Sequence, residues 1–199
     1  MKLVGMTQRV AVDGPHQERR DALDQRWIEF VDACGFVPVL IPNNEIVAQN
    51  IISEIPISGL IFTGGNDLSS LGGDAHERDS TERLLLDWAI SNKKPVLGVC
   101  RGMQVIQEFF GTSLIPVEGH VAAEQEIEFE GNRIVVNSYH RWGSIETPNG
   151  FHCLGNADDG VVKAIKHESL PIMGIMWHPE RFADFRAHDI SLVRDFLGQ

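Results

Sequence analysis

The sequence predicts an α/β fold with a mostly parallel sheet and a smaller antiparallel β section. Before Gly111, apolar strand-like segments alternate with helix-like segments, which is typical of a parallel sheet covered by helices on both faces. After Gly111 the segments have the pattern of hairpin strands. No internal repeat or linker interrupts the 199 residues, so we expect one domain over residues 1–199. These features indicate a three-layer, flavodoxin-like arrangement.

The first half of the chain supplies the parallel elements. A strand is expected at 3–6, and apolar residues at helical spacing predict a helix that starts near Glu18. The segment 36–41 is apolar but contains Pro38, which favours a short strand or an edge strand. The remaining elements expected here are a helix at 46–52, a strand at 60–62, a helix at 82–90 and a strand at 96–99.

The second half supplies the antiparallel section. Segments 127–129 and 133–136 flank a Glu-Gly-Asn turn and predict a hairpin. Further strands are expected at 161–166 and 172–177, and a final helix at 190–197.

Composition and charge exclude several classes of function. The formal net charge is −11, from 17 basic and 28 acidic residues, which argues against nucleic-acid or anionic-membrane partners. No apolar run approaches the roughly 20 residues of a membrane span. The N-terminus has no signal-peptide pattern, and three cysteines do not make a disulfide framework. We therefore expect a cytoplasmic protein.

The most informative segment is a cysteine between two glycines, Gly98-Val99-Cys100-Arg101-Gly102. It joins an apolar strand to a helix expected at 103–110 and is the thiol counterpart of the nucleophile elbow of hydrolases. The glycines are required because the turn is tight and its backbone is strained. A sulfur at a helix N-terminus is favoured as thiolate. The pattern predicts a cysteine that attacks a carbonyl carbon.

A second polar cluster ends the last apolar strand, at Trp177-His178-Pro179-Glu180. Side chains two apart on an extended segment point the same way, so His178 and Glu180 are expected to project together. A carboxylate beside an imidazole fixes its tautomer, and the imidazole can then exchange a proton with a thiol and with a leaving nitrogen.

Other readings of the polar residues are weaker or remain open. Cys34 and Cys153 lack flanking glycines and are expected to be small core residues. The cysteines are far apart and no zinc motif occurs, and Gly64-Gly65-Asn66 lacks the lysine of a P-loop. We therefore expect no metal and no cofactor. The Gly64-Gly65 pair also fits a simple turn, and His140 fits a structural role as well as a substrate contact.

Three motifs in this order closely resemble class I glutamine amidotransferases, especially their stand-alone γ-glutamyl hydrolase branch. Along the chain they are the Thr63-Gly64-Gly65-Asn66 segment, the cysteine turn with Met103-Gln104 and the Trp177-His178-Pro179-Glu180 segment. The resemblance implies the class I glutamine amidotransferase fold, a small-molecule γ-glutamyl substrate and no cofactor. It also implies these roles: Cys100 as nucleophile, His178 as acid and base, Glu180 as its partner, the Gly65 and Arg101 amides as oxyanion hole, and Gln104 and the Asn137-Ser138-Tyr139-His140 segment as the glutamate site.

Peripheral segments are similar, more narrowly, to bacterial γ-glutamyl-CDP-amidate hydrolases of capsule phosphoramidate biosynthesis. These segments contain Arg9, Arg19 and Arg20, which either clamp a pyrophosphate or form ordinary surface pairs. The narrower likeness implies cleavage to glutamate and cytidine diphosphoramidate. Alternatives are another γ-glutamyl amide such as γ-glutamyl-γ-aminobutyrate or a folate polyglutamate, a glutaminase subunit that needs a separate synthase partner, and a non-catalytic binding module. A homodimer is left open.

Overall fold

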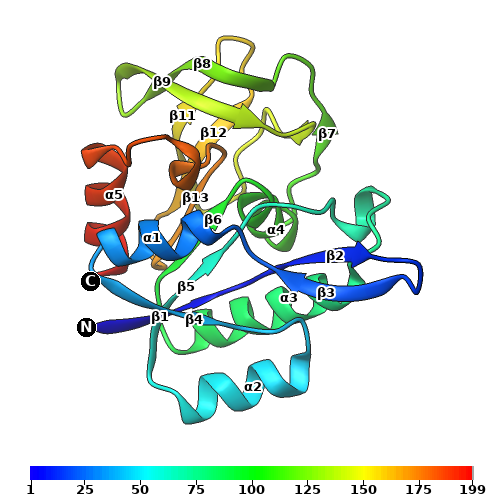
Figure 1. Ribbon diagram of the computed structural model, residues 1–199. Coiled ribbons are helices and arrows are strands. Elements are labelled where there is room, and N and C mark those ends of the chain that lie inside the picture. Colours follow the sequence, from blue (N-terminus) through cyan, green and yellow to red (C-terminus); the bar gives the residue numbers. More distant parts are fainter. Residues whose placement is uncertain (199) are drawn as a thin grey trace.

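The computed structural model describes residues 1–198 and is built around one nine-stranded sheet (Figure 1). The strand order is β4-β1-β5-β6-β13-β12-β11-β8-β9. The sheet strands are β1 (Lys2–Met6), β4 (Phe36–Leu40), β5 (Ile57–Phe62), β6 (Val96–Val99), β8 (Val121–Phe129), β9 (Asn132–Tyr139), β11 (Phe151–Asn156), β12 (Val162–His167) and β13 (Ile172–Ile175). Two small antiparallel pairs lie outside it: β2 (Arg9–Asp13) with β3 (Glu18–Ala22), and β7 (Ile115–Pro116) with β10 (Trp142–Gly143).

The strands β4, β1, β5, β6 and β13 are neighbours in this order and are mutually parallel. This is the flavodoxin-like order, in which the second parallel strand of the chain, β4, lies at the edge of the sheet and the first, β1, lies next to it. The other four strands continue the same sheet in antiparallel pairs. The expected α/β class, with a parallel part and an antiparallel part, is confirmed. The edge position expected for the strand with Pro38 is confirmed too, because β4 ends the sheet.

Helices cover both faces of the parallel part and make three layers (Figure 1). Helices α1 (Gln25–Ala33) and α5 (Ala187–Leu197) pack on one face, through Phe30 and Val193 among others. Helices α2 (Glu45–Glu54), α3 (His76–Ser91) and α4 (Arg101–Phe109) pack on the other, through Leu85 and Ile106 among others. The strands are therefore buried on both sides, which accounts for their continuous apolar sequences.

One sequence expectation about an element is wrong. The helix expected to start near Glu18 starts at Gln25, and residues 18–22 form the second strand of a hairpin with β2. A turn with positive φ at Gly14 and Gln17 reverses the chain. Asp24 then caps the helix by accepting a hydrogen bond from the backbone N–H of Arg26.

A second correction concerns Cys153, which is exposed and not, as expected, in the core. It lies on β11, a strand that the sequence did not predict, next to an irregularity in the pairing with β12 between Cys153 and Gly155. Such a bulge changes the face on which a side chain lies. Cys34 is buried in the core, as expected, and burial raises the pKa of its thiol to about 12. None of the helices in the described residues has both the length and the apolarity to span a membrane.

Candidate active site

The cysteine lies in a strained turn at the carboxyl end of β6. Cys100 has φ 54° and ψ −106°, which is rare for a residue with a side chain, and α4 begins at the next residue. A Cβ at Gly98 would lie 2.7 Å from Ile106 Cδ1, and one at Gly102 would lie 2.7 Å from Phe62 Cβ and collide with the Phe62 carbonyl. The glycines therefore let α4 approach the sheet closely enough to hold the turn.

His178 reaches the same edge of the sheet from the neighbouring strand, β13. Its Nδ1 lies 2.7 Å from Glu180 Oε1, and both side chains are buried. The expected pairing is present, but its local geometry differs from the expectation. The segment does not stay extended, because a single 3₁₀ turn at Pro179–Arg181 follows His178.

The charge of His178 depends on both neighbours. Burial by itself lowers the pKa of the imidazole, but the charge of Cys100 and hydrogen bonds to Cys100 and Glu180 raise it to about 9. The protonated ring is therefore the favoured state at neutral pH. The two motifs are therefore coupled electrostatically, since the charge of Cys100 is the largest cause that raises the pKa of His178.

Asn137 fixes the backbone of His178. Its side-chain Nδ2 donates to the His178 carbonyl at 2.8 Å, and its Oδ1 accepts from the His178 N–H at 2.8 Å. The side chain of Asn137, which was expected at the glutamate site, thus fixes the backbone of His178 from its position on β9. The ring of His178 also packs against Gly64, where a Cβ would come within 2.6 Å of Cε1.

A cleft of about 390 Å³ opens above Cys100, within the range of small-molecule sites. Tyr139 contributes an exposed wall and its ring centroid lies 5.9 Å from that of His178. The cleft is lined by Gly65, Asn66, Asp67, Cys100, Arg101, Gln104, Val121, Tyr139, His140 and Arg141. Six of the predicted site residues therefore line one opening, and His178 and Glu180 line a neighbouring pocket.

A buried polar network supports the wall formed by residues 137–140. Lys163 Nζ donates to Ser138 Oγ at 3.0 Å and contacts His140 Nε2 at 2.7 Å. His140 Nδ1 and Gln104 Nε2 both donate to the carbonyl of Trp142, at 2.9 and 2.8 Å. Burial and the Lys163 charge lower the pKa of His140 to about 3, and burial lowers the pKa of Lys163 to about 7. His140 is therefore a neutral structural member of the wall that also lines the cleft.

The three arginines that were considered as a phosphate clamp do not lie together at one site. On the β2–β3 hairpin, Arg19 pairs with Glu77 at 2.7 Å and Arg20 with Asp13 at 2.7 Å, as surface arginines commonly do. Neither belongs to the walls of the two pockets beside Cys100 and His178. Arg9 does: its stem lies against Gly65, and it lines a smaller pocket of about 140 Å³ that His178 and Glu180 also line.

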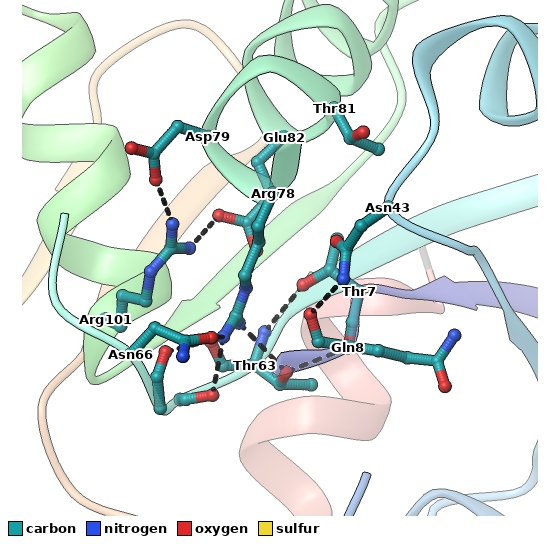
Figure 2. Close-up of polar contacts among 12 residues, drawn as sticks. Thr7, Gln8, Asn43, Thr63, Asn66, Arg78, Asp79, Thr81, Glu82 and Arg101 are labelled. Carbon is teal, nitrogen blue, oxygen red and sulfur yellow. Dashed lines mark hydrogen bonds and ion pairs between the residues drawn. The ribbon is translucent and has the colours of Figure 1, made fainter. Parts of the chain in front are cut away.

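Sequence reasoning missed the charged residues beneath the site. Arg78 and Glu82 on α3 are fully buried and form an ion pair at 3.0 Å, and Glu82 also binds the Arg101 guanidinium (Figure 2). Burial raises the pKa of Glu82, but the two arginines outweigh it and lower the pKa. The spacing of four residues between Arg78 and Glu82 on a predicted helix was a sequence signal for an ion pair. The position of Lys163 within an apolar strand was a signal for a buried cation. Within residues 1–198, no group of three or more side chains is arranged to hold a metal ion.

Comparison with known proteins agrees with this geometry. A family model described as glutamine amidotransferase class-I matches residues 24–198. The chain belongs to this family. A γ-glutamyl-CDP-amidate hydrolase of Campylobacter jejuni is 30% identical to this class I glutamine amidotransferase over 200 residues, covering 98% of this chain and 97% of the relative. The glutamine-hydrolysing GMP synthase subunit of Pyrococcus abyssi is 31% identical over 172 residues, covering 80% and 81%.

Solved structures share the fold at lower identity. A Thermoplasma acidophilum protein described as a GMP synthase subunit superposes with a TM-score of 0.73 at 19% identity, covering 100% of this chain and 93% of that one. A glutamine amidotransferase of Thermotoga maritima gives a TM-score of 0.70 at 15% identity, covering 99% and 84%. The fold expected from the resemblance is confirmed.

Proposed function

We propose that this protein is a cysteine-dependent hydrolase that cleaves a γ-glutamyl amide bond and releases glutamate. The observation that carries the proposal is the position of Cys100 and the His178–Glu180 pair after two neighbouring parallel strands, β6 and β13, beside two pockets that both include Gly65. A thiol hydrogen-bonded to an imidazole that a carboxylate orients is the arrangement of an activated nucleophile. Membership of the family and the 30% identical hydrolase support the γ-glutamyl substrate class.

In the first step, the Cys100 thiolate attacks the γ-carbonyl carbon while His178 holds the proton. The developing oxyanion accepts hydrogen bonds from the backbone amides of Gly65 and Arg101. The C–N bond then breaks, and the leaving nitrogen takes the proton from imidazolium His178. This leaves glutamate bound to the sulfur as a thioester.

In the second step, neutral His178 takes a proton from water, and the resulting hydroxide attacks the thioester. The C–S bond breaks and glutamate is released, with the thiolate–imidazolium pair restored. Glu180 keeps the Nδ1 proton of His178 in place throughout, so that Nε2 faces the reacting atoms. The Gln104 side chain and the 137–140 segment form the glutamate site in this proposal.

The leaving group we propose is cytidine diphosphoramidate, the group in the name of the Campylobacter relative. Arg9 supports an anionic leaving group, because it is exposed and lines a pocket with Gly65 and His178, whereas Arg19 and Arg20 are paired with carboxylates. The alternative is a glutaminase subunit that supplies ammonia to a separate synthase. It is favoured by the similarity to the Pyrococcus GMP synthase subunit over four-fifths of the chain.

The test is to compare kcat/KM for a panel of γ-glutamyl compounds, with and without candidate synthases. The panel contains γ-glutamyl-CDP-amidate, γ-glutamyl-γ-aminobutyrate, a folate polyglutamate and glutamine. Cys100→Ala serves as the control and is expected to abolish turnover while leaving the circular dichroism spectrum unchanged. Turnover of the cytidylyl compound by the isolated protein supports the proposal, and turnover of glutamine only with a synthase present supports the alternative. Activity near the wild-type level in Cys100→Ala would remove the mechanism.

A further inference from the structure

Arg78 binds three consecutive carbonyls of the loop that contains Gly65. Its guanidinium donates to the carbonyl of Thr63 at 2.6 Å, of Gly64 at 3.1 Å and of Gly65 at 2.5 Å (Figure 2). The side chain comes from α3 and is completely buried. A planar guanidinium has five donors in a fixed arrangement, so it can hold several acceptors at once, which the ammonium of lysine does less well.

Holding these carbonyls also orients the amides between them. In a trans peptide unit the C=O and the following N–H point in opposite directions, and the described chain contains no cis peptide. With the Gly64 carbonyl bound to Arg78, the N–H of Gly65 must point away from Arg78. Gly65 has φ +88° and lines the cleft together with Cys100.

The same ion cluster reaches the other proposed oxyanion donor. One oxygen of Glu82 accepts from Arg78 Nε at 3.0 Å, and the other accepts from the guanidinium of Arg101, which also binds Asp79. Arg101 is the first residue of α4, so its backbone N–H follows Cys100 directly. A single buried carboxylate thus connects the loop after β5 to the first residue of α4.

We propose that Arg78 is a positioning residue that aims the Gly65 N–H at the oxyanion, and that Glu82 couples this donor to the Arg101 N–H. The inference rests on the proposed function for its catalytic consequence. Stability alone is a weak explanation of the cluster, since a buried ion pair is often no more stabilising than well-packed apolar side chains. Binding three successive carbonyls of one loop is a geometric constraint that apolar side chains cannot reproduce.

The experiment compares Arg78→Met and Arg78→Lys with Arg194→Met as a matched control. Arg194 also donates to two consecutive backbone carbonyls, those of Ala33 and Cys34. These carbonyls lie where α1 leads into β4, the outermost strand, and not in the loops around Cys100. Loss of one oxyanion donor lowers kcat by about 100- to 1,000-fold in known hydrolases. We expect kcat for the best γ-glutamyl substrate to fall by at least about 100-fold in Arg78→Met, with KM changed by less than about threefold. In Arg78→Lys, which keeps the charge, we expect a smaller loss of kcat and the same unchanged KM.

Two further measurements separate positioning from folding. Arg194→Met is expected to lower the melting temperature without a matching loss of kcat. A low, non-denaturing concentration of guanidinium is expected to restore part of kcat in a third variant, Arg78→Ala, which leaves space for the ion, and to leave kcat of Arg194→Met unchanged. Unchanged kcat in a folded Arg78→Met, or equal losses of kcat in the Arg78 and Arg194 variants, would overturn the inference.

Amide hydrogen exchange gives a readout that needs no turnover. The amides of residues 64–66 are expected to exchange faster in Arg78→Met than in wild type, while those of α1 do not change. If the wild-type protein hydrolysed no compound of the panel, the proposed function would fail, and this exchange would still decide whether Arg78 holds the loop. Unchanged exchange at residues 64–66 counts against the inference in either case.

Discussion

The charge of Cys100 and the pairing with Glu180 raise the pKa of His178 and so set the pH range in which the proposed reaction runs. The pKa of His178 is raised to about 9, and its Nδ1 lies 2.7 Å from a carboxylate oxygen that is almost entirely buried. Because His178 must be protonated to donate to the leaving nitrogen in the first step, we expect kcat/KM, which reports the ionisation of the free enzyme, to be constant at neutral pH and to fall as pH rises through about 9.

Glu180→Gln removes the carboxylate charge and keeps the size of the side chain. A hydrogen bond to a charged group contributes about 1.5–3 kcal/mol and one pKa unit corresponds to about 1.4 kcal/mol, so the pKa of His178 should fall by about one to two. The fall of kcat/KM should then be centred near pH 7–8, roughly one to two units lower. The stability linked to this ring has the same sign: with its pKa raised from 6.5 to about 9, it is present in full below 6.5 and lost as pH rises through about 9.

The assay is kcat/KM for γ-glutamyl-p-nitroanilide between neutral and alkaline pH, measured by the release of the coloured amine. Glu18→Gln is the control, because Glu18 pairs with Arg20 on the exposed hairpin and its loss should leave the profile unchanged. A basic limb at the same pH in Glu180→Gln and wild type would refute the assignment of the acid to the His178–Glu180 pair.

Three other substitutions test the surroundings of the site. Gly102→Ala places a Cβ against the Phe62 backbone and is expected to lower the free energy of unfolding by about 1–3 kcal/mol in urea titrations, whereas a change within a few tenths would contradict the close approach of α4 to β5. Asn137→Ala breaks both hydrogen bonds to the His178 backbone. We expect a lower melting temperature and a kcat reduced about tenfold or more, since buried partners left unpaired cost about 1–3 kcal/mol each. A wild-type kcat would show that these two hydrogen bonds are dispensable for activity. Arg9→Ala is expected to raise KM for phosphate-bearing substrates and not for glutamine, with Arg20→Ala as the control on the same hairpin; an equal rise for glutamine would exclude a phosphate contact.

Hydrophobic patterning predicted the elements that pack against the sheet core. The strand Val96–Val99 was predicted with its observed bounds, because a buried parallel strand is apolar throughout and the glycine-flanked cysteine marks its end. The hairpin β2–β3 was not predicted, because Glu18–Ala22 is charged and exposed and pairs only with one neighbouring strand. Its strand character comes from the turn and the partner rather than from burial.

The polar part of the site was predictable only where chemistry restricts residue type. Cysteine, histidine and glutamate in fixed spacing indicate a nucleophile and its base, and the structure brings these three residues together. The roles of Arg78, Glu82 and Lys163 were not predicted, because spacing and apolar neighbours indicate a pair or a buried cation but not which groups the side chain holds. Their burial is decided by the loop and strands that cover them, which is tertiary information.

The burial and hydrogen bonding of His140 determine how the charge of the cleft wall changes with pH. A histidine is ordinarily the side chain whose charge changes in mild acid, but here Lys163 occupies Nε2 and the Trp142 carbonyl occupies Nδ1. The ring has no free position at which to gain a proton, so acidification leaves this wall of the cleft uncharged at that point. Between neutral and weakly acidic pH the charge that changes in this wall is that of Lys163, whose pKa is about 7, so an acid limb in the activity profile would have to originate at Lys163, in the substrate or elsewhere in the protein.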